Sequence, residues 1–135
     1  SINIIDYKLG GKKPTIDELW NGISLQLPFY LYAAAKLVSK KRGSTVTPEW
    51  MYIYSLKYRK NDFGKQKVSL TKKRKDVDIE SMNKDLIEST LNHIRKYVKS
   101  IAEGKFNLSP HDDREKLICG YCQFKSICRI QEVPL

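Results

Sequence analysis

The alternation of apolar and polar residues predicts a short strand at the start of the chain, over residues 2–8. Side chains two positions apart in a strand share a face, so Asp6 and Lys8 point the same way, about 6–7 Å apart along the strand, while Ile5 and Tyr7 cover the other side. A carboxylate beside an ammonium at the end of an apolar strand fits either a solvated strand end or a metal-and-water site. The strand considered by itself favours the solvated end.

Helix signals follow this strand after a loop that is rich in Gly and Lys. Thr15 and Glu18 have the spacing of a capping box, which starts a short helical turn that ends near Gly22. A longer helix, rich in Leu, Ala and aromatic residues, is predicted from Ser24 to about Ser39. The basic residues and the glycine that follow it, at positions 40–43, are typical of a helix end.

Two polar residues of the longer helix share one of its faces. Gln26 and Tyr30 are four positions apart, which places them one above the other on the helix surface. Pro28 falls between them in the first turn, where proline is tolerated. The pair by itself favours a solvated glutamine beside a packed tyrosine.

The strongest strand pattern lies at residues 48–60, where aromatic and aliphatic side chains alternate. Both faces are apolar at first, which predicts a strand that lies centrally in its sheet or is covered by helices. A turn at residues 61–64 and a shorter return strand at residues 66–71 are predicted to follow.

An amphipathic helix is predicted from about Ile79 to Glu103, with Asp78 as its N-cap and Gly104 after its end. Its apolar positions recur at spacings of mostly three and four, and they are Ile79, Met82, Leu86, Leu91, Ile94, Val98 and Ile101. Strands interleaved with helices predict a mixed α/β (α+β) fold, and a length of 135 residues fits one domain.

Positive charge concentrates in the middle of the chain. The formal net charge is +10, from 25 Lys and Arg against 15 Asp and Glu, which is typical of a domain that binds a polyanion, with nucleic acid considered before an anionic membrane. The candidate DNA-binding residues are Lys57, Arg59, Lys60, Lys72, Lys73 and Arg74. Their crowding argues against a basic domain without a partner. Because no apolar run approaches the ~20 residues that cross a bilayer, we expect DNA and no membrane.

The three cysteines all lie near the C-terminal end of the chain, as Cys119, Cys122 and Cys128. The spacing C-x2-C-x5-C can bring thiolates around one soft metal centre, either zinc or iron–sulfur, and three unrelated buried cysteines are the alternative. A fourth ligand has to come from His111, from His93 or from outside this chain. An odd number of cysteines does not make a disulfide framework, and it favours a reducing, cytoplasmic compartment.

Taken in order, the Asp6-x-Lys8 strand, the Gln26-x3-Tyr30 helix and the terminal cysteines resemble the C-terminal half of a RecB-type nuclease of the PD-(D/E)xK superfamily, in its iron–sulfur form. The likeness extends over nearly the whole chain. Residues 5–8, Ile-Asp-Tyr-Lys, stand where these nucleases carry their DYK strand, with Leu9 in place of the usual Thr. The resemblance is to AddB-like helicase–nuclease subunits, and the CRISPR-associated exonucleases of the RecB type are the alternative.

The resemblance implies a restriction-endonuclease-like mixed sheet flanked by helices, and an exonuclease that hydrolyses DNA with Mg²⁺ or Mn²⁺. In such a nuclease Asp6 and the main-chain carbonyl of Tyr7 bind the metal, Lys8 positions the attacking water, and Gln26 and Tyr30 line the site. The metal acidifies the water and neutralises charge on the phosphate. The implied setting is double-strand break repair and recombination, with DNA and a helicase–nuclease subunit as partners.

The resemblance also assigns parts of the site to residues upstream of this chain. The family carries a further metal-binding Asp and the first cluster cysteine there, so the three cysteines match the last three ligands of a 4Fe–4S cluster. We therefore expect residues 1–135 to be the C-terminal portion of one nuclease domain, with core in 1–110 and a cysteine tail in 111–135, and to be weak or inactive alone. The rivals outside the nuclease class are a catalytically inactive DNA-binding module and a zinc-stapled interaction domain.

Overall fold

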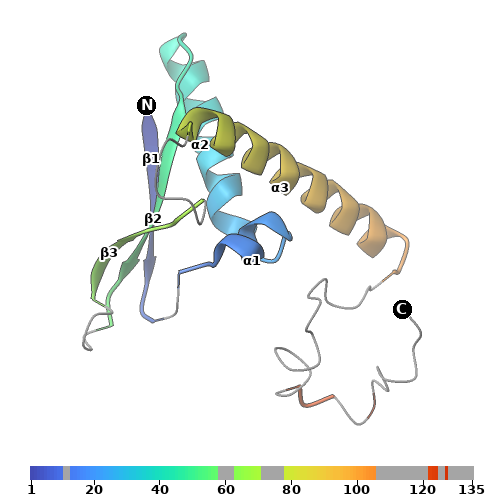
Figure 1. Ribbon diagram of the computed structural model, residues 1–135. Helices are drawn as coiled ribbons and strands as arrows, with labels where there is room; N and C mark the ends of the chain where they lie inside the picture. The colour runs from blue at the N-terminus through green and yellow to red at the C-terminus, as the bar shows by residue number, and fades with distance from the viewer. Residues whose placement is uncertain (11–12, 58–62, 71–77, 106–121, 125–126, 128–135) are drawn as a thin grey trace.

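A computed structural model describes residues 1–10, 13–57, 63–70, 78–105, 122–124 and 127 of the chain. Its elements are β1 (Ile2–Lys8), α1 (Ile16–Trp20), α2 (Gln26–Arg42), β2 (Pro48–Ser55), β3 (Gly64–Lys67) and α3 (Ile79–Ala102), and they are labelled in Figure 1. A mixed sheet packs against helices, so the predicted α/β (α+β) class is confirmed. The predicted irregular cysteine segment lies outside the described residues, except for the short pieces at 122–124 and 127.

The sheet has the order β1-β2-β3, with β1 parallel to β2 and β3 antiparallel to β2. The parallel pairing requires a crossover, and α1 and α2 supply it. Strand β2 is central, as its two apolar faces predicted. It ends at Ser55 and not at residue 60, because the amide of Leu56 makes a last bond to the Lys8 carbonyl (2.8 Å) and β1 ends there as well.

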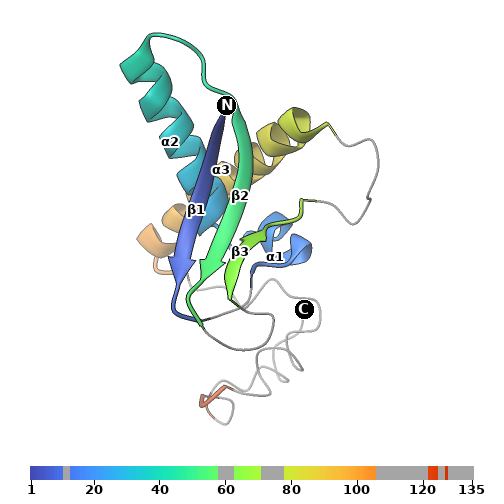
Figure 2. The ribbon, with the colours of Figure 1, turned by 90° about the vertical axis from the view of Figure 1, so that its left-hand side faces the viewer.

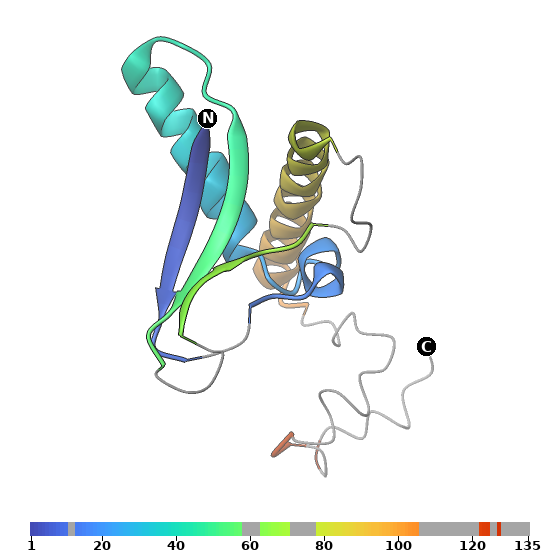
Figure 3. The same ribbon diagram turned by 60° about the vertical axis from the view of Figure 1, so that its left-hand side comes forward.

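The helices cover one face of the sheet. Figure 2 looks onto the other face, with the helices behind the strands, and Figure 3 shows α1 beside α3. On the covered face lies one apolar cluster, formed by Leu19, Leu27, Leu31, Met51, Ile53, Val68, Leu70 and Leu86. Burial of such side chains stabilises the fold by roughly 1.5–3 kcal/mol each. The return strand runs from Gly64 to Lys67 and is shorter than predicted. The Val68 amide makes one more bond to β2, to the Met51 carbonyl (2.9 Å), and the side chains of Val68 and Leu70 are buried in this core.

The start of α1 follows its local signal, whereas the start of α2 differs from the predicted one. At α1, the Thr15 hydroxyl accepts a bond from the Glu18 amide and the Glu18 carboxylate accepts one from the Thr15 amide, so the predicted capping box is confirmed. Helix α2 starts at Gln26 and not at Ser24, and it continues to Arg42 before Gly43 stops it with φ of 66°. Cations in the last turn favour this longer helix, because they lie at the negative end of the helix dipole.

Helix α3 shows the largest departure from the predicted packing. Asp78 caps it as predicted, with Oδ1 accepting bonds from two amides of the first turn. Its buried residues are Asn83, Leu86 and Thr90, whereas Val98 and Ile101 are 60% and 61% exposed. The prediction that these last two pack inward is wrong, because the C-terminal half of α3 extends past the strands (Figure 1). Among the described residues, no helix is long and apolar enough to span a membrane.

Candidate active site

Four of the predicted site residues meet where the end of β1 approaches the start of α2. Lys8 Nζ lies 2.9 Å from Asp6 Oδ2 and donates a hydrogen bond to Gln26 Oε1 at 3.4 Å. Gln26 Nε2 in turn donates to the Tyr30 hydroxyl at 3.4 Å. The four side chains therefore form one continuous polar row across two elements.

Local structure explains why this row forms. Strand alternation turns Asp6 and Lys8 toward the helices. Both are half-buried whereas Tyr7 is exposed, which confirms the predicted faces. Helix α2 packs Leu27 and Leu31 into the core, and its starting turns lie beside the end of β1. Gln26 and Tyr30 lie on the same side of the helix, where Gln26 bonds to Lys8 and to Tyr30. Both side chains are exposed, so the solvated glutamine agrees with the structure, whereas the interpretation of Tyr30 as a packed residue is wrong.

The Asp6 carboxylate is the most constrained group in this row. Its side chain is 18% exposed, and Oδ2 is shielded from solvent and accepts no hydrogen bond from any residue that the structure describes. The Lys8 ammonium balances its charge at 2.9 Å, but without the alignment of a hydrogen bond. The oxygen thus has a charge partner and still has room for a further donor or a cation.

The donor chemistry fits part of a magnesium site. Mg²⁺ prefers oxygen ligands, and Asp6 Oδ2 is such a ligand with spare capacity. The Leu56 amide, which follows β2, donates to the Lys8 carbonyl. Successive carbonyls of a strand point to opposite edges, so the Tyr7 carbonyl points away from β2. That edge of β1 pairs with no described strand. Within the described residues, no group of three or more His, Cys, Asp or Glu side chains could hold a metal. The site as described thus supplies one carboxylate and one carbonyl.

The sequence also matches a known family. A sequence model described as PD-(D/E)XK nuclease superfamily matches residues 1–129. The chain belongs to this superfamily. The row from Asp6 to Tyr30 consists of residues that the resemblance to this superfamily predicted for the site.

Curated relatives of this superfamily member are named as a subunit of an ATP-dependent helicase/deoxyribonuclease. The protein of Bacillus mycoides (strain KBAB4) is 24% identical over 180 residues, covering 97% of this chain and 15% of the relative. The protein of Alkaliphilus metalliredigens (strain QYMF) is 23% identical over 173 residues, covering 95% of this chain and 15% of the relative. The chain therefore spans about 15% of the length of the curated relatives it matches. No solved structure matches it significantly.

The other predicted site residues of this chain are placed only in part. Lys57 is half-buried, and its amide donates to the Ser55 hydroxyl at 3.3 Å. The remaining basic candidates lie outside the described residues, and they are Arg59, Lys60, Lys72, Lys73 and Arg74. Cys122 is exposed, while Cys119 and Cys128 also lie outside the described part of the chain.

Sequence reasoning missed Ser55 as a neighbour of the site. Ser55 is the register partner of Lys8 on β2 and is 1% exposed. Strand partners in register have side chains on the same face, so the Ser55 hydroxyl lies beside the polar row. The alternation within residues 48–60 predicts its face, but only the pairing of β1 with β2 reveals its neighbour.

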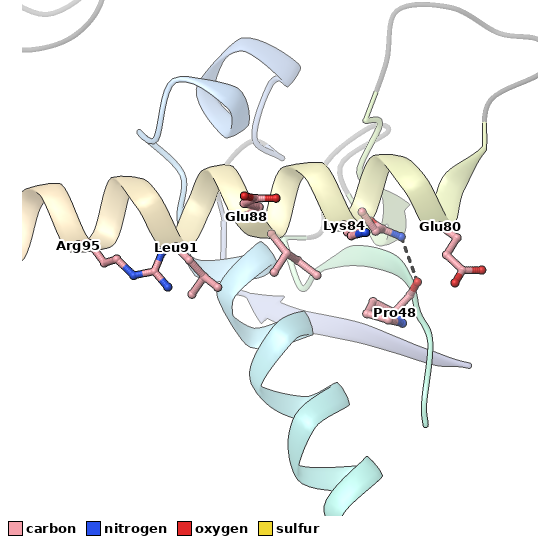
Figure 4. Close-up of a pocket in the computed structure, with 8 residues that line it drawn as sticks. Pro48, Glu80, Lys84, Glu88, Leu91 and Arg95 are labelled. Atoms are coloured by element: carbon pink, nitrogen blue, oxygen red, sulfur yellow. Dashed lines mark hydrogen bonds between the residues drawn. The ribbon is translucent and has the colours of Figure 1, made fainter. Parts of the chain in front are cut away.

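A groove of about 430 Å³ lies elsewhere, along α3 (Figure 4). Pro48, Ile87 and Leu91 supply its apolar part, and charged side chains of α3 surround it. Asn83 of α3 links the helix to the start of β2, because its Nδ2 donates to the carbonyls of Pro48 (3.2 Å) and Glu49 (2.7 Å). None of the polar row lines this groove, so the candidate active site and the groove are separate features.

Proposed function

We propose that this chain carries part of the active site of a metal-dependent deoxyribonuclease. The single observation that carries the proposal is the Asp6 oxygen, which is shielded, accepts no hydrogen bond within the described residues and lies 2.9 Å from the Lys8 ammonium. Membership of the nuclease superfamily supports the same assignment. Mg²⁺ or Mn²⁺ is the expected cation, because both favour oxygen ligands.

Each residue of the row has a role that its position allows. Asp6 Oδ2 and the Tyr7 carbonyl would hold the cation, which supplies Lewis-acid stabilisation of phosphate charge and an acidified water when bound. Lys8 orients the attacking water and offsets negative charge on the phosphate. Gln26 holds the Lys8 ammonium in place, and the Tyr30 hydroxyl in turn supports Gln26.

For the whole protein we propose an exonuclease that acts within a helicase–nuclease in double-strand break repair and recombination, with DNA and a helicase-bearing subunit as partners. The relatives named as a helicase/deoxyribonuclease subunit support this setting. A CRISPR-type exonuclease of the same superfamily is the second candidate. Residues outside the described part would complete the metal ligands.

We further propose that Cys119, Cys122 and Cys128 bind an iron–sulfur cluster in the complete protein. Their C-x2-C-x5-C spacing supports this assignment. The measurement is metal content and visible absorbance after anaerobic purification. We expect bound iron and the visible charge-transfer absorbance of an iron–sulfur cluster. Stoichiometric zinc without iron would overturn the proposal in favour of a zinc-stapled segment.

The central test is Asp6→Asn in the complete protein, with Asp85→Asn as a matched control on the exposed surface of α3. Asp6→Asn should lower Mg²⁺-dependent DNA cleavage by about 100-fold or more, because it removes a metal-binding carboxylate. It should also abolish the rise in melting temperature that Mg²⁺ gives the wild type. Undiminished cleavage by Asp6→Asn would refute the site, and DNA binding without any wild-type cleavage would support the inactive-module alternative.

A further inference from the structure

The solvent face of α2 carries positive charge and no negative charge. Between Gln26 and Arg42 the helix contains neither Asp nor Glu. Its basic residues are all exposed, and they are Lys36, Lys40, Lys41 and Arg42. The other long helix differs, because α3 exposes acidic and basic side chains together. The single sign of charge is therefore a property of α2 and not of every helix surface in this chain.

The helix dipole explains only part of this charge. Cations in the last turn are favourable because the C-terminal end of a helix is negative, and by the same rule acids are favourable in the first turn. Both α1 and α3 have acids in their first turns, whereas α2 has none. Lys36 also precedes the basic last turn of α2. The lack of acids over the whole helix is instead what an anionic partner would require.

The charged face of α2 continues directly from the candidate active site. Gln26, Tyr30, Leu37 and Lys41 follow one another at spacings of four and seven, so they lie in one line along the helix. All four are exposed, and Leu37 in the middle of the line is 68% exposed. The line starts within the polar row, because Gln26 bonds to both Lys8 and Tyr30. We call these four residues the α2 line.

The length and direction of the α2 line suit a nucleic-acid backbone. Figure 3 shows α2 running from the end of β1 back along the strand. Lys41 follows Gln26 by 15 positions, which corresponds to about 22 Å of helix. Phosphates of a stacked DNA strand follow one another at about 3.4 Å, so the line spans about six of them. Because one continuous helix carries the line, the distance from the site to its basic end is fixed.

We propose that the α2 line binds the backbone of the DNA that the site cuts, with Lys40 and Lys41 on phosphates about six steps from the cleaved bond. The inference rests on the proposed function and places the DNA relative to its site. It differs from the sequence-based assignment, which put DNA binding on basic residues from Lys57 onwards. An acidic polypeptide is the other class of occupant, but it gives no reason for the charged face to start beside the residues that hold Lys8.

The first test measures how the complete protein binds a duplex oligonucleotide in EDTA at several salt concentrations. Lys40→Gln and Lys41→Gln should each weaken binding and lower its salt dependence by about 0.9, because one phosphate is no longer neutralised. Lys96→Gln, at an exposed position of α3, is the matched control and should change neither quantity. Unchanged salt dependence in both α2 variants would overturn the proposal, in favour of an acidic polypeptide on this face.

The second test locates the contact along the DNA. One phosphate at a time is replaced by an uncharged methylphosphonate, at successive positions from the bond that is cut. The cleavage rate of wild type at low DNA concentration should fall most for a replacement about six steps away. Lys41→Gln should show no such fall at that position, because the cation facing the phosphate is already absent. An equal fall in Lys41→Gln would overturn the placement.

The two tests also separate this inference from the proposed function. The salt dependence in EDTA requires no cleavage, so it can be read whatever Asp6→Asn shows. Loss of cleavage in Asp6→Asn together with unchanged salt dependence in the α2 variants would leave the active site in place and overturn only the path of the DNA. Lower salt dependence in the α2 variants with undiminished cleavage by Asp6→Asn would support the α2 line as a DNA-binding surface and refute the site.

Discussion

Lys8 on β1 donates a hydrogen bond to Gln26 on α2 at 3.4 Å, although 18 positions separate them in the chain. This bond holds the ammonium beside Asp6 Oδ2 instead of letting it extend into solvent. A lysine has several freely rotating bonds, so a fixed ammonium requires partners on more than one element. The position of the Lys8 ammonium beside Asp6 thus depends on Gln26 of α2.

Lys8→Met should separate the catalytic role of Lys8 from its structural role. Cleavage should fall by about 100-fold or more, because a positioned charge at the phosphate is lost. The free energy of unfolding should change by about 1 kcal/mol or less, since the ion pair is partly exposed, at 35% and 18% of its side chains. Cleavage assays and urea denaturation measure the two effects, with Lys96→Met on exposed α3 as the control.

Gln26→Ala and Tyr30→Phe should lower cleavage by unequal amounts. Gln26 contacts Lys8 directly, so its loss should reduce kcat about tenfold, which corresponds to ~1.4 kcal/mol. Tyr30→Phe removes only the hydroxyl that Gln26 contacts, and a smaller reduction is expected. Because both act through Lys8, the double variant should be no slower than Gln26→Ala alone. Additive losses would instead assign Tyr30 its own contact with substrate.

Gly22→Ala should destabilise the fold more than Gly43→Ala. Both glycines have positive φ, 71° and 66°, so both variants carry the backbone strain of about 1 kcal/mol. A Cβ on Gly22 would also lie 2.4 Å from His93 Cγ, whereas one on Gly43 meets nothing within 4 Å. Gly22→Ala should therefore exceed Gly43→Ala by at least about 1 kcal/mol in urea denaturation.

The contact with His93 provides the check on that explanation. His93 Nε2 lies 3.1 Å from the Trp20 carbonyl, so the ring is held against the end of α1. In a His93→Ala background the clash is absent, and Gly22→Ala should then be no more destabilising than Gly43→Ala. If the difference between the two glycine variants persists there, steric contact with His93 is not its cause.

Thr90→Val and Asn83→Leu should act in opposite directions. Thr90 Oγ1 is buried and has no hydrogen-bond partner among the described residues, so an isosteric apolar residue should be neutral or stabilising, by up to about 1 kcal/mol. Asn83 donates to two carbonyls at the start of β2, and its replacement should be destabilising by roughly 1–3 kcal/mol. Thermal unfolding of both variants compares them directly, and a destabilised Thr90→Val would show that its hydroxyl has a partner.

Most of the secondary structure was predictable from local patterns. The faces of β1, the capping box at Thr15 and the Asp78 cap all agree with the sequence prediction, because they depend on residues within four positions of one another. The ends of β2 and β3 were not predictable in this way. A strand ends where its partner ends or where the core draws the chain away, and both depend on distant residues.

The candidate site was likewise predictable in part from local sequence and in part only from tertiary packing. The sequence by itself determined that Asp6 and Lys8 share a strand face and that Gln26 and Tyr30 share a helix face, since backbone periodicity dictates both. Only the tertiary structure decided that the two faces meet, that Ser55 stands beside Lys8, and that Val98 and Ile101 stay exposed. These depend on the parallel pairing of β1 with β2 and on where α2 and α3 cross the sheet, which are set by packing between segments far apart in the chain.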